Sequence, residues 1–228
     1  MPYEIKKAAV LGAGVMGASI AAHLTNAGID CVLLDILPPA LTEEDRQKGW
    51  TEETPAWRNK LAQKGLAQAV KIKPAAFYTK KNAARIRTGN FEDHLTWLKE
   101  VDWVIEAVVE DLEIKQQLLA RIAGHLKPTC IVSTNTSGLP ARDIVTKAGA
   151  SLKSRFVCTH FFNPPRYMKL LEIVPGPDTL PEVLAFMVKF CEDVLGKGVV
   201  VCKDVPNFIG NRIGVFDIGN AMRLMVEK

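Results

Sequence analysis

The segment from residue 5 to residue 35 reads IKKAAVLGAGVMGASIAAHLTNAGIDCVLLD. An apolar run at residues 5–11 leads directly into a turn that contains three glycines. Apolar residues at helical spacing continue as far as Gly28, and residues 29–34 form a second apolar run. Short apolar runs are typical of buried strands, and the spacing between them indicates a helix that packs against those strands. The segment therefore predicts a strand, a glycine turn, a helix and a second strand.

The three glycines of the turn, Gly12, Gly14 and Gly17, fit the pattern G-x-G-x-x-G. In that pattern the first glycine permits a tight turn, the second lets a pyrophosphate approach the backbone, and the third lets the helix pack closely on the strand. The first helical residues, Val15 and Met16, would bring free N–H groups and the positive end of the helix dipole to the phosphates. The turn therefore predicts a dinucleotide site, and the alternative is that its glycines serve packing alone.

Asp35 ends the second apolar run, eighteen residues after Gly17. An acid at this place accepts hydrogen bonds from the ribose hydroxyls and repels a 2′-phosphate. The next three residues, Ile36, Leu37 and Pro38, include no arginine that could hold such a phosphate. We therefore expect NAD rather than NADP as the cofactor.

Apolar runs alternate with helical segments along the rest of the chain. The expected strands lie at 103–109, 130–134, 156–160, 170–174 and 199–202, and the expected helices at 58–70, 112–126, 181–195 and 213–225. This alternation predicts an α/β fold of the Rossmann type, with a doubly wound, mostly parallel sheet that is parallel at least in its first half.

Two domains are expected. Residues 1–204 form the cofactor-binding domain, with a less regular insertion at residues 38–100 that contains a basic helical segment at 58–87. Residues 205–228 read as the start of a C-terminal helical domain, because an apolar helix that stops at Lys228 has little to pack against. We therefore expect the chain to be part of a longer protein.

Composition excludes several classes of protein. The chain has 228 residues, of which 48% are hydrophobic and 24% charged, as in an ordinary globular protein. Its longest nearly apolar run, residues 8–22, falls short of the roughly 18 apolar residues that a membrane-spanning helix needs, and it makes a poor signal peptide. The five cysteines include no C-x-x-C pair, which favours a reducing, cytoplasmic location and argues against a metal site.

Positive charge is concentrated in one segment. The whole chain carries a net charge of +4, but residues 58–87 contain nine lysines and arginines and no acid. Because the total is only +4, the remainder of the chain carries −5. A basic segment on an otherwise acidic chain points to a small anionic molecule rather than to nucleic acid, and the alternative is a solvated basic helix.

His160 and Glu172 are the candidate acid–base groups. His160 ends an apolar run and precedes FFNPP, and histidine is the side chain best matched to proton transfer near neutral pH. Glu172 lies inside the apolar run 170–174, where a carboxylate is costly unless it is paired. The two side chains are expected to pair if their strands are neighbours, and the alternative for Glu172 is an exposed place on an edge strand. Periodicity alone does not single out Glu106, Glu110, Ser137 or Asn211.

Several motifs resemble those of the 3-hydroxyacyl-CoA dehydrogenases of fatty-acid β-oxidation. They are GAGVMG at 12–17, VIEAVVED at 104–111 with Lys115, NTS at 135–137, HFFNP at 160–164, LLEIV at 170–174 and DVPNFIGNR at 204–212. The resemblance covers nearly the whole chain. Its most specific part is HFFNP with a glutamate twelve residues after the histidine.

The resemblance implies a reaction and roles for four residues. An (S)-3-hydroxyacyl-CoA and NAD would give a 3-oxoacyl-CoA, NADH and a proton. His160 would be the general base and Glu172 would orient it, while Ser137 and Asn211 would line the nicotinamide and the substrate.

The resemblance also implies binding residues. Glu110 and Lys115 would contact the cofactor, and the backbone at Asn163 would help to hold the substrate oxygen. Because the implied substrate carries coenzyme A, the basic segment becomes a candidate site for its phosphates, through Lys60 and Lys64 on one helical face.

The sequence departs from the usual family pattern at two places. Asn207 stands where glycine is usual, and Gly138 stands where a second serine is frequent. The long segment 38–100 is more similar to the dehydrogenase part of the large fused β-oxidation enzymes, which implies an attached enoyl-CoA hydratase module and a homodimer formed through C-terminal helices outside this chain. The alternatives are a non-catalytic NAD-binding fragment and a dehydrogenase of a small, CoA-free hydroxyacid.

Overall fold

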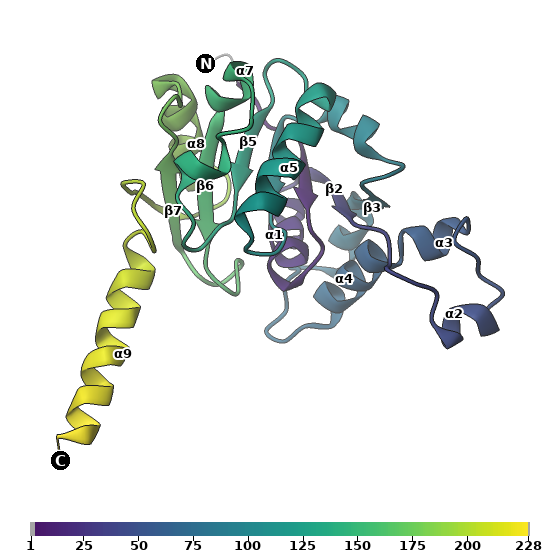
Figure 1. Cartoon of the computed structure of the whole chain (residues 1–228), viewed down its shortest axis with the longest axis horizontal. Helices are drawn as coiled ribbons and strands as arrows, with labels where there is room; N and C mark the ends of the chain where they lie inside the picture. Colours follow the sequence, from purple (N-terminus) through teal and green to yellow (C-terminus); the bar gives the residue numbers. More distant parts are fainter. Residues whose placement is uncertain (1–2, 228) are drawn as a thin grey trace.

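An eight-stranded sheet lies at the centre of the computed structural model, which describes residues 3–227 (Figure 1). The strands are β1 (Lys7–Leu11), β2 (Asp30–Asp35), β3 (Ile86–Asn90), β4 (Trp103–Glu106), β5 (Ile131–Thr134), β6 (Phe156–Phe161), β7 (Leu170–Pro175) and β8 (Gly198–Val201). They lie in the order β3-β2-β1-β4-β5-β6-β7-β8, and only the pair β6 and β7 is antiparallel. Strand order runs outward in both directions from β1 and β4, so the expected doubly wound, mostly parallel sheet is confirmed.

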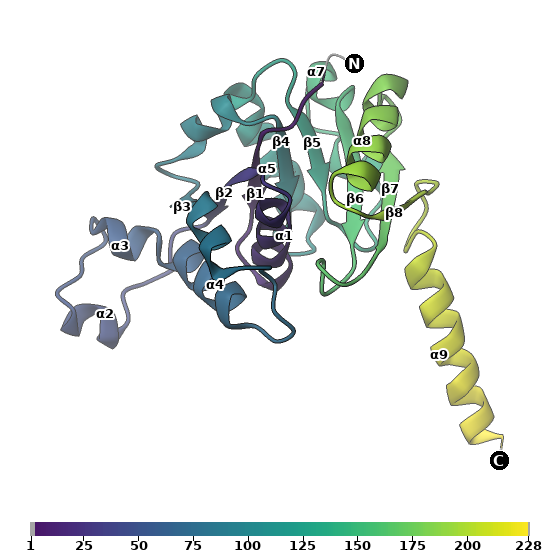
Figure 2. The same ribbon diagram turned by 180° about the vertical axis from the view of Figure 1, so that it is seen from behind.

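Helices cover both faces of the sheet (Figures 1 and 2). The longer helices of the chain are α1 (Val15–Asn26), α4 (Lys60–Lys71), α5 (Leu112–Ile122), α8 (Pro181–Asp193) and α9 (Gly210–Val226), and the shorter ones are α2 (Glu43–Gln47), α3 (Pro55–Arg58), α6 (Ala141–Ile144) and α7 (Ala150–Lys153). Of these, α2, α3 and α9 do not cover the sheet. Short 3₁₀ turns occur at η1 (Lys80–Arg85), η2 (Leu95–Glu100) and η3 (Ala123–His125). One hydrophobic core takes side chains from α1, α4 and α8, and the other from α5, α6, α7 and η2.

The central strand β1 contributes to both cores. Ala8 and Val10 pack into the first core, Ala9 and Leu11 pack into the second, and all four residues are 0% exposed. A strand that is buried on both faces has no polar face, which explains why residues 8–11 read as a continuous apolar run.

The segment 38–100 holds the main difference from the sequence analysis. Although the segment reads as an irregular insertion, its residues Ile86–Asn90 form β3, which pairs in parallel with β2 and extends the sheet by one strand. The sequence hides this strand because Ile86 is its only large apolar residue and because it lies at the edge of the sheet. The helix expected at 58–70 is confirmed as α4, whereas β4 ends at Glu106 rather than at residue 109.

Two parts of the chain extend away from the sheet (Figures 1 and 2). The first carries α2 and α3, and Asp45 of α2 binds the Lys60 ammonium at 2.5 Å. The second is α9, which has no buried residue between Gly210 and Val226 and exposes apolar side chains such as Phe216 and Met222. Among residues 3–227, no helix is both long and apolar enough to cross a membrane.

Candidate active site

The residues expected to carry chemistry lie at one edge of the sheet. β1, β2, β4, β5 and β6 are mutually parallel, so their carboxyl ends meet at the same edge. The order reverses between β1 and β4, which is where open α/β sheets bind ligands. Gly12, Asp35, Glu106 and His160 all lie at or directly after these strand ends.

The glycine turn has the geometry that a pyrophosphate site requires. Gly12 has a positive φ of 100°, and a Cβ there would lie 2.6 Å from the Ala107 carbonyl oxygen. A Cβ on Gly17 would overlap the Gly12 carbonyl oxygen, because α1 crosses β1 closely at this point. A Cβ on Gly14 would meet nothing within 4 Å, so the space in front of the turn is open. The three glycines therefore have the geometry that the three tasks of a dinucleotide-binding turn require.

The first turn of α1 is free to bind an anion. Gly14 caps the helix without any side-chain hydrogen bond, and no acid lies in the first turn. Val15, the first helical residue, is 56% exposed, whereas Met16 packs partly against the core. The unpaired N–H groups and the helix dipole thus face open space, which suits the phosphates of a dinucleotide.

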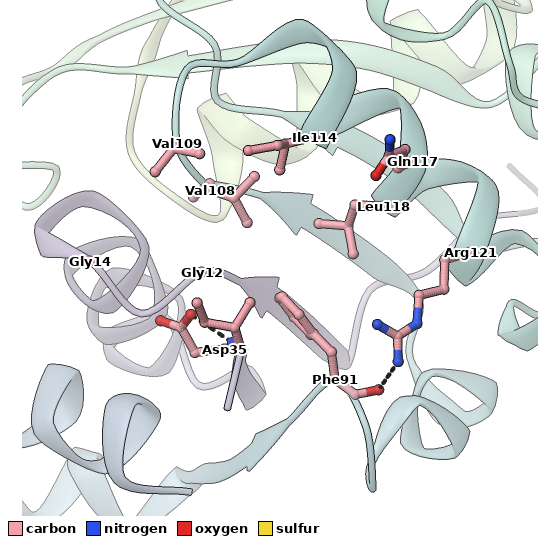
Figure 3. A pocket seen from close by; sticks show the side chains of 12 residues that line it. Gly12, Gly14, Asp35, Phe91, Val108, Val109, Ile114, Gln117, Leu118 and Arg121 are labelled. Atoms are coloured by element: carbon pink, nitrogen blue, oxygen red, sulfur yellow. Dashed lines mark hydrogen bonds between the residues drawn. The ribbon is translucent and has the colours of Figure 1, made fainter. Parts of the chain in front are cut away.

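A pocket of about 510 Å³ adjoins the turn (Figure 3). Asp35 lies on one side of it, with Oδ2 accepting a hydrogen bond from the Ala13 N–H at 2.8 Å. The opposite wall is mostly apolar and comes from the β4–α5 connection and from α5: Val108, Val109, Ile114, Gln117 and Leu118. Arg121 also lines the pocket, and its guanidinium group donates to the Phe91 carbonyl at 2.9 Å and pairs with Glu92 at 2.8 Å. A carboxylate with an apolar slot beside it fits a ribose and an adenine.

His160 and Glu172 form the expected pair. They are direct partners in the antiparallel register of β6 and β7, and His160 Nδ1 lies 2.7 Å from Glu172 Oε2. Both side chains are buried, at 6% and 1% exposure. The His160 ring packs against Phe162 and Phe208, with centroids 4.4 and 5.9 Å apart. Because Glu172 is ionised and accepts from Nδ1–H, Nε2 is the nitrogen that can accept a proton.

The second oxygen of Glu172 caps α9. Oε1 accepts hydrogen bonds from the N–H groups of Ile209 and Gly210 at 3.0 and 2.7 Å. Burial by itself would raise the pKa of Glu172, but the hydrogen bonds from His160 and from these two amides outweigh it and hold the pKa below its usual value. Glu172 therefore stays ionised beside the histidine, and it also ties α9 to the sheet.

Ser137 and Asn211 meet at the same place. The Asn211 side-chain amide, in the first turn of α9, donates to the Ser137 carbonyl oxygen at 2.9 Å. Ser137 itself is exposed in the turn after β5. Asn135 of the same turn accepts from the Phe161 N–H at 2.9 Å, which fixes the turn against the end of β6. Ser137 and Asn211 thus lie in contact although they are 74 positions apart in the sequence.

Glu110 and Lys115 belong to a charged network beside this turn. The Lys115 ammonium lies 2.7 Å from Glu106 and 3.3 Å from Glu110, and its side chain is only 1% exposed. Glu110 Oε1 accepts from Thr136 Oγ1 at 2.5 Å and from the Ser137 N–H at 2.8 Å. Burial would raise the pKa of Glu110, but Thr136, Lys115 and the Ser137 amide outweigh it and lower that pKa.

The residues predicted to contact the substrate, Lys60, Lys64 and Asn163, do not all lie together. Lys60, in the first turn of α4, is held by Asp45, and Lys64 is exposed one turn later. Asn163 is exposed after β6 and lines a smaller pocket of about 240 Å³ with Ile72 and Lys73, at the other end of α4. The rise of the helix separates the two ends of α4 by roughly 16 Å.

Some contacts of the candidate site were not predicted from the sequence. Glu106 is 0% exposed and joins Lys115 to β4. The sequence does contain a signal for its burial, because Glu106, like Glu172, is a carboxylate inside an apolar run. The apolar wall of the pocket around Gln117 and Leu118 lies on α5, where its residues read as ordinary helix positions. The backbone amides that hold Glu172 leave no signal in a sequence.

Comparisons with known proteins agree with this geometry. Residues 7–205 match the family model described as the NAD binding domain of 3-hydroxyacyl-CoA dehydrogenase. The chain is 49% identical to a probable 3-hydroxyacyl-CoA dehydrogenase of Bacillus subtilis, over 96% of this chain and 28% of that protein. It is 42% identical to a putative fatty acid oxidation complex trifunctional enzyme of Rickettsia prowazekii, over 100% of this chain and 29% of that protein.

Solved structures resemble the whole chain. The (S)-3-hydroxybutyryl-CoA dehydrogenase of Ralstonia eutropha matches with a TM-score of 0.71 and 29% identity, over 98% of this chain and 72% of that one. The chain spans less than a third of the length of the Bacillus and Rickettsia relatives. Since the family model covers most of the chain and the glycine turn has the matching geometry, the chain belongs to the 3-hydroxyacyl-CoA dehydrogenase family and contains its NAD-binding domain.

Proposed function

We propose that the protein catalyses the NAD-dependent oxidation of (S)-3-hydroxyacyl-CoA to 3-oxoacyl-CoA in fatty-acid β-oxidation. The observation that carries the proposal is the buried His160–Glu172 contact of 2.7 Å at the sheet edge that also bears the glycine turn. A base with a fixed tautomer, placed beside a dinucleotide site, is what the oxidation of an alcohol to a ketone requires.

In the proposed mechanism His160 Nε2 removes the proton of the substrate's 3-hydroxyl group. Glu172 accepts the hydrogen bond from Nδ1–H and stabilises the imidazolium that forms, as the acid of a catalytic triad does. Ser137 and Asn211 hold the substrate oxygen, and the backbone at Asn163 helps. Bound NAD supplies the hydride acceptor. Phe162 and Phe208 shield the ring from water, which strengthens the charge interaction between His160 and Glu172.

The proposed cofactor contacts combine the geometry of the glycine turn and Asp35 with roles that the family resemblance implies for Glu110, Lys115 and Ser137. Gly12, Gly14 and Gly17 shape the pyrophosphate turn, and Val15 and Met16 present the N–H groups of the helix start. Asp35 binds the ribose hydroxyls next to adenine. Glu110, Lys115 and Ser137 lie around the nicotinamide end. The open space above Gly14 and the anchored carboxylate of Asp35 support the assignments of the glycine turn and of Asp35.

Lys60 and Lys64 are the proposed contacts for the phosphates of coenzyme A. Lys64 is exposed on α4, whereas Lys60 would have to share its ammonium with Asp45 or exchange it for the phosphate. Replacing both lysines with glutamine should raise the KM for acyl-CoA and weaken its dependence on salt. An unchanged KM would assign these lysines to a solvated helix face.

The proposal also covers the larger protein, its oligomeric state and its cellular location. The Bacillus and Rickettsia relatives are more than three times as long as the matched region, which supports a larger protein with an enoyl-CoA hydratase module. The exposed apolar residues of α9 support C-terminal helices that cover it and form a homodimer. Five free, buried cysteines support a reducing, cytoplasmic location.

The test compares two substrates in the direction of NADH consumption. Acetoacetyl-CoA should be reduced efficiently and free acetoacetate should not, because only the first carries the coenzyme A group. Equal rates would identify a dehydrogenase of small hydroxyacids, and NADH binding without turnover of either would identify a binding module.

Replacing His160 with glutamine tests the assignment of the base. The variant should lose roughly 10²–10⁴-fold in kcat while it binds NADH normally, because the ring lies apart from the glycine turn. Retention of most of the turnover would exclude His160 as the base.

A further inference from the structure

Glu106 is a fully buried carboxylate that the proposed mechanism does not use. It ends β4, is 0% exposed and lies between apolar strands. Its Oε1 accepts from the Lys115 ammonium at 2.7 Å and from the Val108 N–H at 2.8 Å, and its Oε2 accepts from the Thr134 hydroxyl at 2.5 Å. A carboxylate kept in such a place needs every one of these partners, because burial of an unpaired charge is costly.

The contacts of Glu106 continue to the active-site turn. Lys115 bridges Glu106 to Glu110, whose side chain is 44% exposed. Glu110 Oε1 then accepts from Thr136 Oγ1, from the Ser137 N–H and from the Gly138 N–H, at 2.5, 2.8 and 3.2 Å. Three donors of one turn therefore converge on one oxygen atom, and the other oxygen of that carboxylate, Oε2, lies 3.3 Å from the Lys115 ammonium.

We propose that Glu106 is a positioning residue for the reaction, which acts through Lys115 and Glu110 to hold the Ser137 turn against Asn211 and His160. The inference rests on the proposed function, in which Ser137 holds the substrate oxygen. Glu106 itself touches neither substrate nor cofactor, since it is enclosed by β4, β5 and α5.

The charges explain why Glu106 must be ionised for this role. Lys115 lies between two carboxylates, and the closer one, Glu106, holds its ammonium away from the surface. Without the negative charge of Glu106, the ammonium is drawn toward Glu110 Oε2. Glu110 then rotates, and its Oε1 leaves the amides of Ser137 and Gly138. An ångström of such displacement is enough to lower turnover substantially, because hydride and proton transfer depend on exact placement.

The central variant is Glu106→Gln, which keeps the shape but removes the charge. Its oxygen can still accept from Lys115 and from the Val108 N–H, and its NH₂ group can donate to the Thr134 hydroxyl, which can also accept. We expect kcat to fall by about tenfold or more. The dissociation constant for NADH should rise by a smaller factor, because the displaced Glu110, Lys115 and Ser137 are proposed contacts at the nicotinamide end whereas the glycine turn and Asp35 are untouched. Glu113→Gln is the matched control, since Glu113 is an exposed carboxylate on α5, two residues before Lys115.

A double-mutant cycle with Lys115→Met identifies the route of the effect. Because Glu106 acts through Lys115, adding Glu106→Gln to the Lys115→Met protein should leave kcat unchanged within about twofold. A further large drop in the double variant would overturn the proposal. If either single variant does not fold, the double variant is compared with the wild type, because it leaves neither charge buried without its partner, and it should show the same fall in kcat of about tenfold or more.

Amide hydrogen exchange monitors whether the turn at residues 135–139 stays in place, and it does not depend on catalytic activity. In Glu106→Gln the amides of residues 135–139 should exchange faster, while the Ala13 amide, which binds Asp35, keeps its protection. Uniformly faster exchange would indicate a merely structural role, and unchanged exchange at the turn would overturn the proposal. If the wild-type protein showed no turnover, the proposed function would fail while this measurement still tested the network.

Discussion

Replacing Glu172 with glutamine changes the tautomer of His160 while it preserves the fold. The new side chain can still accept hydrogen bonds from the amides of Ile209 and Gly210, which lie at 3.0 and 2.7 Å. Its oxygen therefore points toward α9, and its NH₂ group faces His160 Nδ1 at the position of the 2.7 Å contact. Two donors cannot share one hydrogen bond, so the ring proton moves to Nε2 and the base is lost.

The expected size of the effect follows from the proposed role of Glu172, which is that of the acid in a catalytic triad. In serine proteases the corresponding loss of tautomer lowers kcat by about 10⁴-fold, or about 5 kcal/mol of transition-state stabilisation. Here the contact is also short and buried, with 6% and 1% exposure of the two side chains. We expect a fall in kcat of about 10³–10⁴-fold and a loss of about 1 kcal/mol in the free energy of unfolding.

The assay measures the reduction of acetoacetyl-CoA by the wild type and by Glu172→Gln, with NADH binding followed by fluorescence. Glu192→Gln is the control, because Glu192 is an exposed acid on α8. Binding of NADH should be the same in all three proteins. If Glu172→Gln kept more than roughly a tenth of the wild-type kcat, the orienting role of Glu172 would be refuted.

Two further predictions concern stability. Gly17→Ala should lower the free energy of unfolding by about 1–3 kcal/mol and weaken NADH binding, because the added Cβ overlaps the Gly12 carbonyl and pushes α1 off β1. Urea unfolding and a titration with NADH measure the two effects. A variant with full stability and normal NADH binding would contradict this prediction. His23, buried on α1, has its pKa lowered to about 4 by burial and by nearby Lys197. The unfolded chain takes up this proton below about pH 6.5 and the folded protein does not, so the stability contributed by neutral His23 is complete above that pH and is lost as the pH falls toward 4, by up to about 3 kcal/mol. The urea midpoint should therefore drop more between pH 7 and pH 5 in the wild type than in His23→Leu, and equal drops would assign the pH dependence to other groups.

Local sequence signals predicted the first half of the fold well. β1, α1 and β2 follow directly from the apolar runs and the glycine turn, since the pattern of each element lies within a few residues. The pairing of His160 with Glu172 was also predictable, because two polar residues in neighbouring apolar strands need each other. β3 was missed because an edge strand with one large apolar residue has almost no pattern of its own.

The contacts within the candidate site could not be predicted from local sequence, because they join residues from distant parts of the chain. Periodicity does not distinguish Glu106 from Glu110, although one is 0% exposed and the other is part of the surface. Likewise the resemblance named Ser137 and Asn211, but their 2.9 Å contact depends on where α9 leaves the sheet.

The amino-acid sequence alone specified the class of the fold, the glycine turn and the candidate acid–base pair, His160 and Glu172. These properties depend on glycine conformations, side-chain periods and single titratable groups, all of which are encoded over short stretches of chain. The tertiary structure decided which carboxylate is buried, which lysine is enclosed between two acids, and which backbone amides hold Glu172. Those outcomes depend on the order and register of strands far apart in the sequence, since burial and charge pairing exist only after the strands and helices have packed together.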